Sequence, residues 1–324
     1  MTQATARAHP NIAFIKYWGN VDDTLRLPVN SSISMNLDGL HTETTVTFDD
    51  SLTSDTLTLN GNRETGQALT RVVNHMNRIR QRLEISTFAN IVSANNFPTG
   101  TGIASSAAAF AALTVAAVTA TGNELSEREL STIARTGSGS ASRSVPAGFV
   151  EWYKADTHEA SYAETIATTD HWDLVDVIAI VSDQHKKTGS QTGHTNAKTS
   201  DLQDARIAGA QERLDIVRQA ILDRDFPTFA DVVEKDSNLM HAIMMTSNPP
   251  LFYWKPTTLT VMELVREWRS EGLSVCYTLD AGPNIHCICT RNDAQIVRDR
   301  LQQVSGIMDI RSAGVGGKAT VISE

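Results

Sequence analysis

Hydrophobic and polar residues alternate along the N-terminal part of the chain with the two-residue period of half-buried strands. Residues 42–48 alternate β-branched with polar side chains, and residues 12–15 form a short apolar run. Residues 1–48 are therefore predicted to form strands joined by turns. Asn60-Gly61 marks a turn within residues 49–62, which predicts a β-hairpin there.

The period changes to that of an amphipathic helix over residues 64–83, where apolar side chains share one face and arginines lie elsewhere. Residues 104–120 are mostly alanine with a few larger apolar residues, and they predict a second helix. Ser126 and Glu129 form a capping-box pattern that predicts the start of a third helix, ending at Gly137.

The remaining chain divides into predicted strands and helices. Apolar, β-branched runs predict strands at 148–153, 174–181, 273–279 and 285–290. Helical patterns cover about 204–223, 226–245, 256–270 and 292–303, and the polar stretch 182–199 is predicted to be a loop. Because strand-rich sequence gives way to helices near Ser182, we predict two domains, residues 1–182 and 183–324.

Composition restricts the class of partner. The 324 residues, 41% of them hydrophobic, suffice for a full core. A formal net charge of −9 disfavours nucleic acid and anionic membranes as partners. The sequence contains neither an apolar N-terminal leader nor a run long enough for a membrane span. We therefore expect a cytoplasmic protein that acts on a small molecule.

The three cysteines, Cys276, Cys287 and Cys289, lie close together in a β-rich stretch. This grouping predicts apolar packing in a reducing compartment. Metal ligation by Cys287 and Cys289 together with His286 is the alternative.

Residues 95–106 form a small-residue loop that leads into the alanine-rich helix. Gly100 and Gly102 allow a backbone to approach a phosphate closely, and Ser105 and Ser106 add hydroxyl donors. The free N–H groups of a helix start favour an anion. The stretch lacks the lysine of a P-loop, and an ordinary loop before a buried helix is the alternative.

Other candidate groups are Arg143, Asp280 and two histidines. Arg143 is the one cation in the hydroxyl-rich run 138–144, where it suits a substrate carboxylate or an internal ion pair. Asp280 follows an apolar strand and is either a turn former or a functional carboxylate. His185 and His194 suit a phosphate contact or an exposed surface. Combined with the helix start, these groups suit phosphoryl transfer from ATP with magnesium.

Several blocks occur in a fixed order along essentially the whole chain. They are Asn11-Ile12-Ala13, Lys16-Tyr17-Trp18-Gly19 and residues 27–32, 95–106, 138–143, 236–242, 249–253 and 280–284. Together they resemble the signature blocks of the mevalonate diphosphate decarboxylase family, which belongs with galactokinase, homoserine kinase and mevalonate kinase. The resemblance implies a GHMP-kinase-like two-part α+β fold. The N-terminal part would resemble a protein of the small ribosomal subunit, contain a left-handed β-α-β unit, and bind ATP with Mg²⁺ at the loop 95–106. The C-terminal part would be ferredoxin-like, with the active site in the cleft between them.

The resemblance also implies the reaction, which is ATP-dependent decarboxylation of a 5-phosphorylated mevalonate with Mg²⁺, by a homodimer. Asp280 would orient or deprotonate the 3-hydroxyl, and Arg143 would hold the carboxylate that leaves as CO₂. The implied substrate-binding residues are Asn11, Lys16, Tyr17, Ser138, Ser140, Ser190, Gln191 and His194. The implied ATP-binding residues are Asn95, Pro98, Gly100, Gly102, Ala104, Ser105 and Ser106, with Ser105 also as a Mg²⁺ ligand.

Two departures from the family pattern fall where the substrate phosphates are expected. The usual Tyr-Trp-Gly-Lys ends here in Asn20, and an expected arginine and methionine are replaced by Gln191 and His194. Because a diphosphate demands more cations than a monophosphate, we predict mevalonate 5-phosphate as substrate and isopentenyl phosphate as product. Mevalonate 5-diphosphate is the alternative, with charge supplied by Lys186, Lys187 or Lys198.

Two further functions are less consistent with the residues. A mevalonate 3-kinase that does not decarboxylate would be expected to lack the aspartate at position 280. A non-catalytic sensor of the same fold would be expected to lack that aspartate or the phosphate loop. Both features are present, which favours the decarboxylase.

Overall fold

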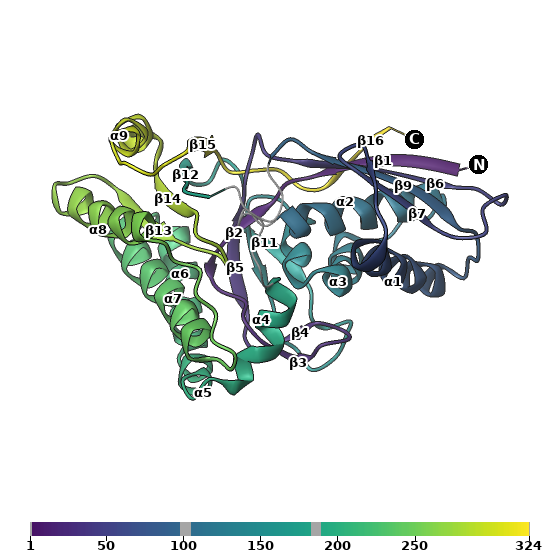
Figure 1. Cartoon of the computed structure of the whole chain (residues 1–324), viewed down its shortest axis with the longest axis horizontal. Helices are drawn as coiled ribbons and strands as arrows, with labels where there is room; N and C mark the ends of the chain where they lie inside the picture. The colour runs from purple at the N-terminus through teal and green to yellow at the C-terminus, as the bar shows by residue number, and fades with distance from the viewer. Residues whose placement is uncertain (1, 98–104, 183–188, 324) are drawn as a thin grey trace.

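The computed structural model of the chain describes residues 2–97, 105–182 and 189–323. The molecule is elongated, and its two termini lie close together at one end, on strands β1 and β16 (Figure 1). Helices fill the opposite end of the molecule. Among the described residues, none of the helices combines the length and the apolar character that a membrane span requires.

A six-stranded sheet in the order β16-β1-β6-β9-β7-β8 forms the terminal end of the molecule. Its strands are β1 (Thr2–Ala8), β6 (Thr42–Phe48), β7 (Thr56–Leu59), β8 (Asn62–Arg63), β9 (Ala89–Asn95) and β16 (Thr320–Ser323). Buried residues alternate with half-buried ones along β6, as predicted. Asn60 and Gly61 both have positive φ and form the predicted hairpin turn between β7 and β8.

Three helices cover this sheet: α1 (Gly66–Leu83), α2 (Ser105–Ala120) and α3 (Glu127–Gly137). Helix α2 is buried around most of its circumference and packs closely on β1 and β6, since alanine side chains are small. The predicted capping box of α3 is present, with Ser126 accepting from the backbone N–H of Glu129 and the Glu129 carboxylate accepting in return.

A second sheet, in the order β11-β10-β5-β2, lies in the middle of the molecule. It contains β2 (Asn11–Ile15), β5 (Ser32–Asn36), β10 (Phe149–Trp152) and β11 (Ala163–Ala167). A small pair, β3 (Asn20–Asp22) and β4 (Leu27–Pro28), lies beside it, and the 3₁₀ helix η1 (Gly139–Ser144) connects α3 to β10.

The third sheet has the order β13-β14-β12-β15, with β12 (Leu174–Ile180), β13 (Val275–Thr278), β14 (Ile285–Thr290) and β15 (Asp309–Ala313). Every residue of β12 is buried, as its apolar run predicts. Helices α8 (Pro256–Ser270) and α9 (Arg291–Gln302) pack on one face of this sheet. Helices α5 (Gln203–Ala208), α6 (Ala210–Asp223) and α7 (Phe226–Thr246) follow one another before α8.

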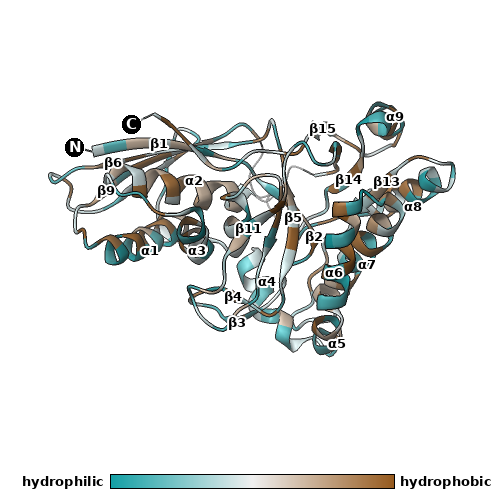
Figure 2. Ribbon diagram, turned by 180° about the vertical axis from the view of Figure 1, so that it is seen from behind, coloured by the Kyte–Doolittle hydropathy of each residue, from teal (hydrophilic) through white to brown (hydrophobic). Residues whose placement is uncertain are grey.

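Hydrophobic residues of β2, β5, α6, α7 and the inner face of the third sheet form one shared core (Figure 2). Strand β12 precedes the boundary expected near residue 182, yet it pairs with β14 and β15 from the C-terminal sequence. The division of the chain into residues 1–182 and 183–324 stays a prediction.

The local structure differs from the sequence prediction in three places. The described part of the expected loop 182–199 contains α4 (Ser190–Asn196) and the 3₁₀ helix η2 (Ala197–Thr199), which are polar and too short to show a period. The helix expected over 204–223 is divided at Gly209 into α5 and α6. Strands β9, β11, β15 and β16 were not predicted, because half-exposed strands carry little apolar pattern.

The cysteines are buried and form no disulfide, in agreement with the apolar packing expected of them. Burial raises the pKa of the Cys287 thiol well above its ordinary value. His286 bonds to Asp176 instead of completing a cysteine cluster, and the described residues include no group of His, Cys, Asp and Glu side chains suited to a metal.

Candidate active site

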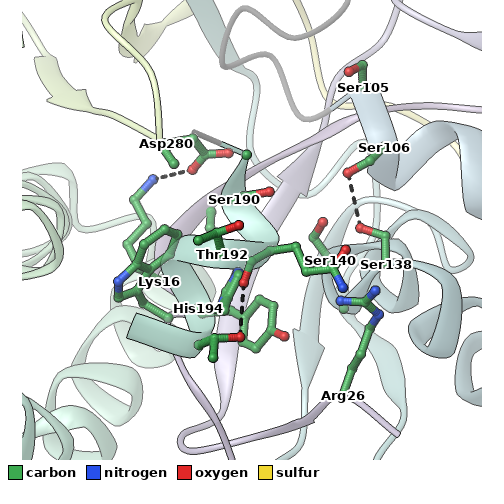
Figure 3. A pocket seen from close by; sticks show the side chains of 18 of the residues that line it. Lys16, Arg26, Ser105, Ser106, Ser138, Ser140, Ser190, Thr192, His194 and Asp280 are labelled. Atoms are coloured by element: carbon green, nitrogen blue, oxygen red, sulfur yellow. Dashed lines mark hydrogen bonds and ion pairs between the residues drawn. The ribbon is translucent and has the colours of Figure 1, made fainter. Parts of the chain in front are cut away.

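A cavity of about 980 Å³ opens between the first two sheets and the C-terminal helices. Its walls come from the segment after β2, the start of α2, the η1 segment, α4 and the end of β13 (Figure 3). The predicted site residues that line it are Lys16, Tyr17, Ser105, Ser106, Ser138, Ser140, Arg143, Ser190, Gln191, His194 and Asp280.

Lys16 and Asp280 form an ion pair, with 2.8 Å between Nζ and Oδ1. The Lys16 side chain is buried, and the two residues lie 264 positions apart in the sequence. Burial disfavours the ionised form of Asp280, but the charges of Lys16, His286 and Arg143 and the hydrogen bond from Lys16 together outweigh it, so the pKa of Asp280 is lowered below its ordinary value. The carboxylate is therefore ionised at neutral pH and able to accept a proton from a nearby hydroxyl group.

Two neighbouring residues of α7 hold the two halves of this pair. Asp236 accepts a hydrogen bond from the backbone N–H of Lys16 at 2.7 Å. Ser237 accepts one from the backbone N–H of Leu279 at 3.0 Å. Arg213 fixes the Asp236 carboxylate at 2.8 Å. The block at 236–242 was part of the family resemblance, but the sequence assigned it no role.

Arg206 is fully buried and holds the backbone of the segment that follows β2. Its guanidinium donates to the carbonyl of Lys16 at 2.7 Å and to that of Trp18 at 3.2 Å. Sequence reasoning missed this residue, because an arginine in a helical pattern is expected on a solvated face.

Arg143 is buried beside Ser32 and Asn11. It donates to Ser32 Oγ at 2.6 Å and to Asn11 Oδ1 at 3.1 Å, and it forms no ion pair within the described ranges. Burial lowers the pKa of Arg143 to about 10, against the opposing charge of Asp280, so the guanidinium stays charged at neutral pH. A buried cation that is bonded only to neutral groups and faces a cavity suits an anionic ligand group.

Asn11 does not line the cavity. Its amide donates to Ser144 Oγ at 2.8 Å and to the carbonyl of Ser140 at 3.0 Å, while its oxygen accepts from Arg143. The structure thus brings Asn11 to the site as a residue that positions Arg143, and the implied direct contact of Asn11 with substrate stays a prediction.

The segment after α3 approaches the start of α2. Ser138 and Ser106 are joined by a hydrogen bond of 3.1 Å between their hydroxyl groups (Figure 3). Gly139 is packed so tightly against Tyr17 that an added Cβ would lie 2.5 Å from its ring. Only glycine therefore lets this segment lie against the Tyr17 ring.

Helix α4 completes the wall with Ser190, Gln191 and His194. The His194 ring stacks on Tyr17, with 4.1 Å between ring centroids, and its Nδ1 accepts from the backbone N–H of Gly19 at 3.0 Å. His194 is thus part of the site wall, whereas His185, Lys186 and Lys187 lie outside the described residues.

A smaller hollow of about 190 Å³ adjoins the cavity and shares Ala68, Arg71, Ser105 and Ser106 with it. Asn95 lies in its wall, and most of its other lining is apolar: Leu57, Leu59, Val72, Ile91, Ala109, Phe110 and Leu113. The remaining residues implied for ATP, Pro98, Gly100, Gly102 and Ala104, lie outside the described part of the chain.

Solved structures with the same fold identify its class. The chain superimposes on mevalonate diphosphate decarboxylase from Staphylococcus aureus with a TM-score of 0.95, at 37% identity over 99% of this chain and 98% of the other. A complex described as "MDDEF in complex with MVAPP, AMPPCP and Magnesium" gives a TM-score of 0.94, at 35% identity over 100% and 99% of the two chains. The fold is therefore the GHMP-kinase-like α+β fold that the resemblance implied.

Sequence comparison is more specific. The family profile described as "Diphosphomevalonate decarboxylase-like N-terminal domain" matches residues 8–163, and that described as "Mevalonate 5-diphosphate decarboxylase C-terminal domain" matches residues 176–319. The diphosphomevalonate decarboxylase of Candida albicans is 42% identical, over 88% of this chain and 83% of its own. The chain therefore belongs to the diphosphomevalonate decarboxylase family of ATP-dependent carboxy-lyases.

Proposed function

We propose that this protein uses ATP and Mg²⁺ to convert mevalonate 5-diphosphate into isopentenyl diphosphate, with release of CO₂, phosphate and ADP. The observation that carries the proposal is the Asp280 carboxylate, paired with Lys16, which shares one cavity with the Arg143 guanidinium and the serines that begin α2. The relatives support the diphosphate as substrate, because their names specify it and one solved complex contains MVAPP, AMPPCP and magnesium.

In the first step Asp280 accepts the proton of the substrate 3-hydroxyl, and the oxygen of that hydroxyl attacks the γ-phosphorus of ATP. The bond between this phosphorus and ADP breaks. Lys16 keeps the Asp280 carboxylate ionised for this purpose. In the second step the C–O bond between the tertiary carbon and the newly phosphorylated oxygen breaks, and phosphate leaves with the electron pair. The C–C bond to the carboxylate then supplies the electrons of the alkene, and CO₂ leaves. Asp280 stabilises the positive charge that builds on the tertiary carbon.

Arg143 holds the carboxylate that becomes CO₂, through charge-assisted hydrogen bonds fixed by Asn11 and Ser32. The small apolar hollow suits a flat base such as adenine, with the phosphates directed toward Ser105 and Ser106. A Mg²⁺ ion would fit there with the Ser105 hydroxyl and phosphate oxygens as ligands, and it would neutralise charge during transfer.

The monophosphate substrate favoured by the sequence analysis is not supported by the relatives. Asn20 and Gln191 stand where the family pattern has cations, but the cavity is also lined by the cations Arg26 and Arg71. One observation still favours mevalonate 5-phosphate as a second candidate. Gln191 lines the cavity without a charge, and Asn20 is bonded to Tyr17 and Asp23.

The test compares the two substrates with ATP and Mg²⁺, scoring CO₂ and the phosphorylated product, with the Asp280→Asn variant as control. Preference for the diphosphate is the expected result, and preference for the monophosphate would replace the first candidate with the second. Phosphorylation without CO₂ would instead indicate a mevalonate 3-kinase. Binding of both ligands while ATP stays intact would indicate a sensor.

A further inference from the structure

Arg26 is a residue of the cavity wall to which the sequence analysis gave no role. It lies in the turn between β3 and β4, next to Leu27, and it has a φ of +52°. An arginine with positive φ is strained, because its Cβ crowds the backbone where glycine or asparagine is tolerated. Strain of this kind, kept at a ligand cavity, is a sign of a functional side chain.

The hydrogen bond that Arg26 makes does not explain why an arginine occupies this strained position. Its Nε donates to the carbonyl of Thr136 at 3.0 Å, and within the described ranges it forms no ion pair. Arg78 donates to the same carbonyl at 2.8 Å and does not line the cavity. Arg78 can therefore cap the end of α3 without Arg26. The Arg26 charge in the cavity wall has no acidic partner among the described residues.

The guanidinium of Arg26 lies at the end of the cavity away from the reacting groups. Figure 3 shows it directed toward Ser138 and Ser140, on the opposite side of the view from Lys16 and Asp280. The same charge acts on Tyr17. Burial raises the pKa of that phenol, and Arg26 is the strongest of the charges that oppose the rise.

The proposed reaction places the substrate along this cavity. With its 3-hydroxyl at Asp280 and its carboxylate at Arg143, the phosphorylated end of the molecule must extend toward another wall. The hydroxyl groups of Ser138 and Ser140 lie at that end, and Arg26 supplies charge beside them. Charge-assisted hydrogen bonds from a guanidinium are well suited to phosphate oxygens.

We propose that Arg26 binds the phosphate at position 5 of the substrate and supplies the charge that Asn20 lacks. This assignment rests on the proposed function for the identity of the ligand. Asn20 lies on the same β3–β4 hairpin, where it accepts a hydrogen bond from the Tyr17 hydroxyl and donates one to Asp23 at 2.8 Å. The hairpin thus uses position 20 for orientation and position 26 for charge.

The test measures steady-state kinetics of Arg26→Gln beside Arg78→Gln, a matched control that removes the other guanidinium on the Thr136 carbonyl. For Arg26→Gln we expect the KM of the phosphorylated substrate to rise about tenfold to a hundredfold, the usual effect of losing a charge-assisted hydrogen bond. The KM of ATP and the kcat should change less than about threefold, and Arg78→Gln should resemble the wild type. The loss should be larger with the diphosphate than with the monophosphate, because the diphosphate carries more charge.

Three outcomes would overturn the proposal. The substrate KM could stay unchanged in Arg26→Gln, the KM of ATP could rise in its place, or Arg78→Gln could reproduce the whole effect. If the wild type turns over neither substrate, the proposed function fails, and Arg26 is tested by calorimetric titration of inorganic diphosphate with the nucleotide site filled by AMPPCP. Weaker binding in Arg26→Gln than in Arg78→Gln would support Arg26 as a phosphate ligand, and equal binding would refute it.

Arg26→Asn separates a phosphate contact from a structural role. Asparagine tolerates positive φ, so the Tm should stay the same or rise while the substrate KM rises as in Arg26→Gln. A residue kept only for folding would instead lower the Tm, and the loss of substrate binding would follow the loss of stability.

Discussion

At the residue scale, the site depends on buried charges whose partners come from distant parts of the chain. Lys16 follows β2 and Asp280 follows β13, and the α7 residues Asp236 and Ser237 hold their backbones in place. The Asp280 side chain is half-buried, and a carboxylate drawn out of water in this way is costly unless a cation is adjacent. The ionised state of Asp280 is therefore a property of the pair, and each member can be tested through the other.

We predict that Lys16→Met raises the pKa of Asp280, because burial then acts without the opposing lysine charge. In the wild type the lowered pKa keeps the carboxylate ionised down to acidic pH. The variant should lose kcat at pH 7 by about a hundredfold or more, the scale of a lost general base, and regain part of it at higher pH. The measurement is the pH dependence of kcat for both proteins. If kcat falls over the same acidic pH range in the wild type and in Lys16→Met, the prediction is contradicted.

A second buried pair supports the strands behind Asp280. His286 Nδ1 and Asp176 Oδ2 are 2.6 Å apart, and both side chains are buried between β12 and β14. Burial opposes protonation of His286, but the charge and hydrogen bond of Asp176, together with the charge of Asp280, outweigh it, so the pKa of His286 is raised above its ordinary value. The stabilisation from the charged pair is therefore complete below about pH 6.5 and is lost as the pH rises through the raised pKa.

His286→Gln should therefore destabilise the protein by about 3 kcal/mol near pH 6, the usual cost of breaking a buried pair. The difference in unfolding free energy between the variant and the wild type should shrink toward pH 9. Urea unfolding of both proteins across this pH range measures it. A difference that grows with rising pH would show that the wild-type histidine is neutral in the folded state.

At the scale of elements, glycines let a helix and a loop pack directly on aromatic rings of the site. Gly193 of α4 lies against Trp18, and Gly139 of η1 lies against Tyr17. A Cβ at either glycine would lie 2.5 Å from the ring, closer than any normal contact. These contacts set the distance between α4 and the segment after β2, and with it the placement of Ser190 and Gln191.

Gly193→Ala should displace α4 and destabilise the protein by about 1–3 kcal/mol, as overpacking usually does. The KM of the phosphorylated substrate should rise, because α4 carries Gln191 and Ser190 into the cavity wall. Gly189→Ala is the matched control, since no atom of the described residues lies within 4 Å of its added Cβ and its φ of −67° suits alanine. Similar effects of the two substitutions would rule out the steric explanation.

At the scale of the whole molecule, the site lies where separately packed layers meet. One core lies between the six-stranded sheet and α1, α2 and α3, and another joins the middle sheet to α6, α7 and the third sheet. Arg206 and Asp236 extend from the C-terminal helices to the backbone that follows β2. The groups assigned to ATP and those assigned to decarboxylation therefore come from different layers and share one cavity.

The homodimer implied by the family resemblance stays a prediction at this scale. Sedimentation equilibrium of the full chain should give twice the mass of one chain, independent of salt if the interface is mainly apolar. A mass equal to one chain at concentrations well above those of the activity assay would contradict it.

The sequence alone identified those features whose causes are local or whose residues keep a fixed order. The capping box at Ser126, the turn at Asn60-Gly61 and the buried strand β12 each depend on near neighbours, and each was confirmed. The ordered blocks indicated the family, which the comparisons confirmed. The catalytic and binding roles assigned to Asp280 and Arg143 stay predictions.

Only the tertiary structure decided which charges meet. It placed Lys16 beside Asp280, put Asn11 behind Arg143, and added Arg26 to the cavity wall. A charge count based on Asn20 and Gln191 considered only the positions of the family pattern, and so it missed Arg26 in the turn of the same hairpin. The reason is physical: helix caps and turns depend on residues a few positions apart, whereas the field at a site depends on all charges within several ångströms, whatever their distance along the chain.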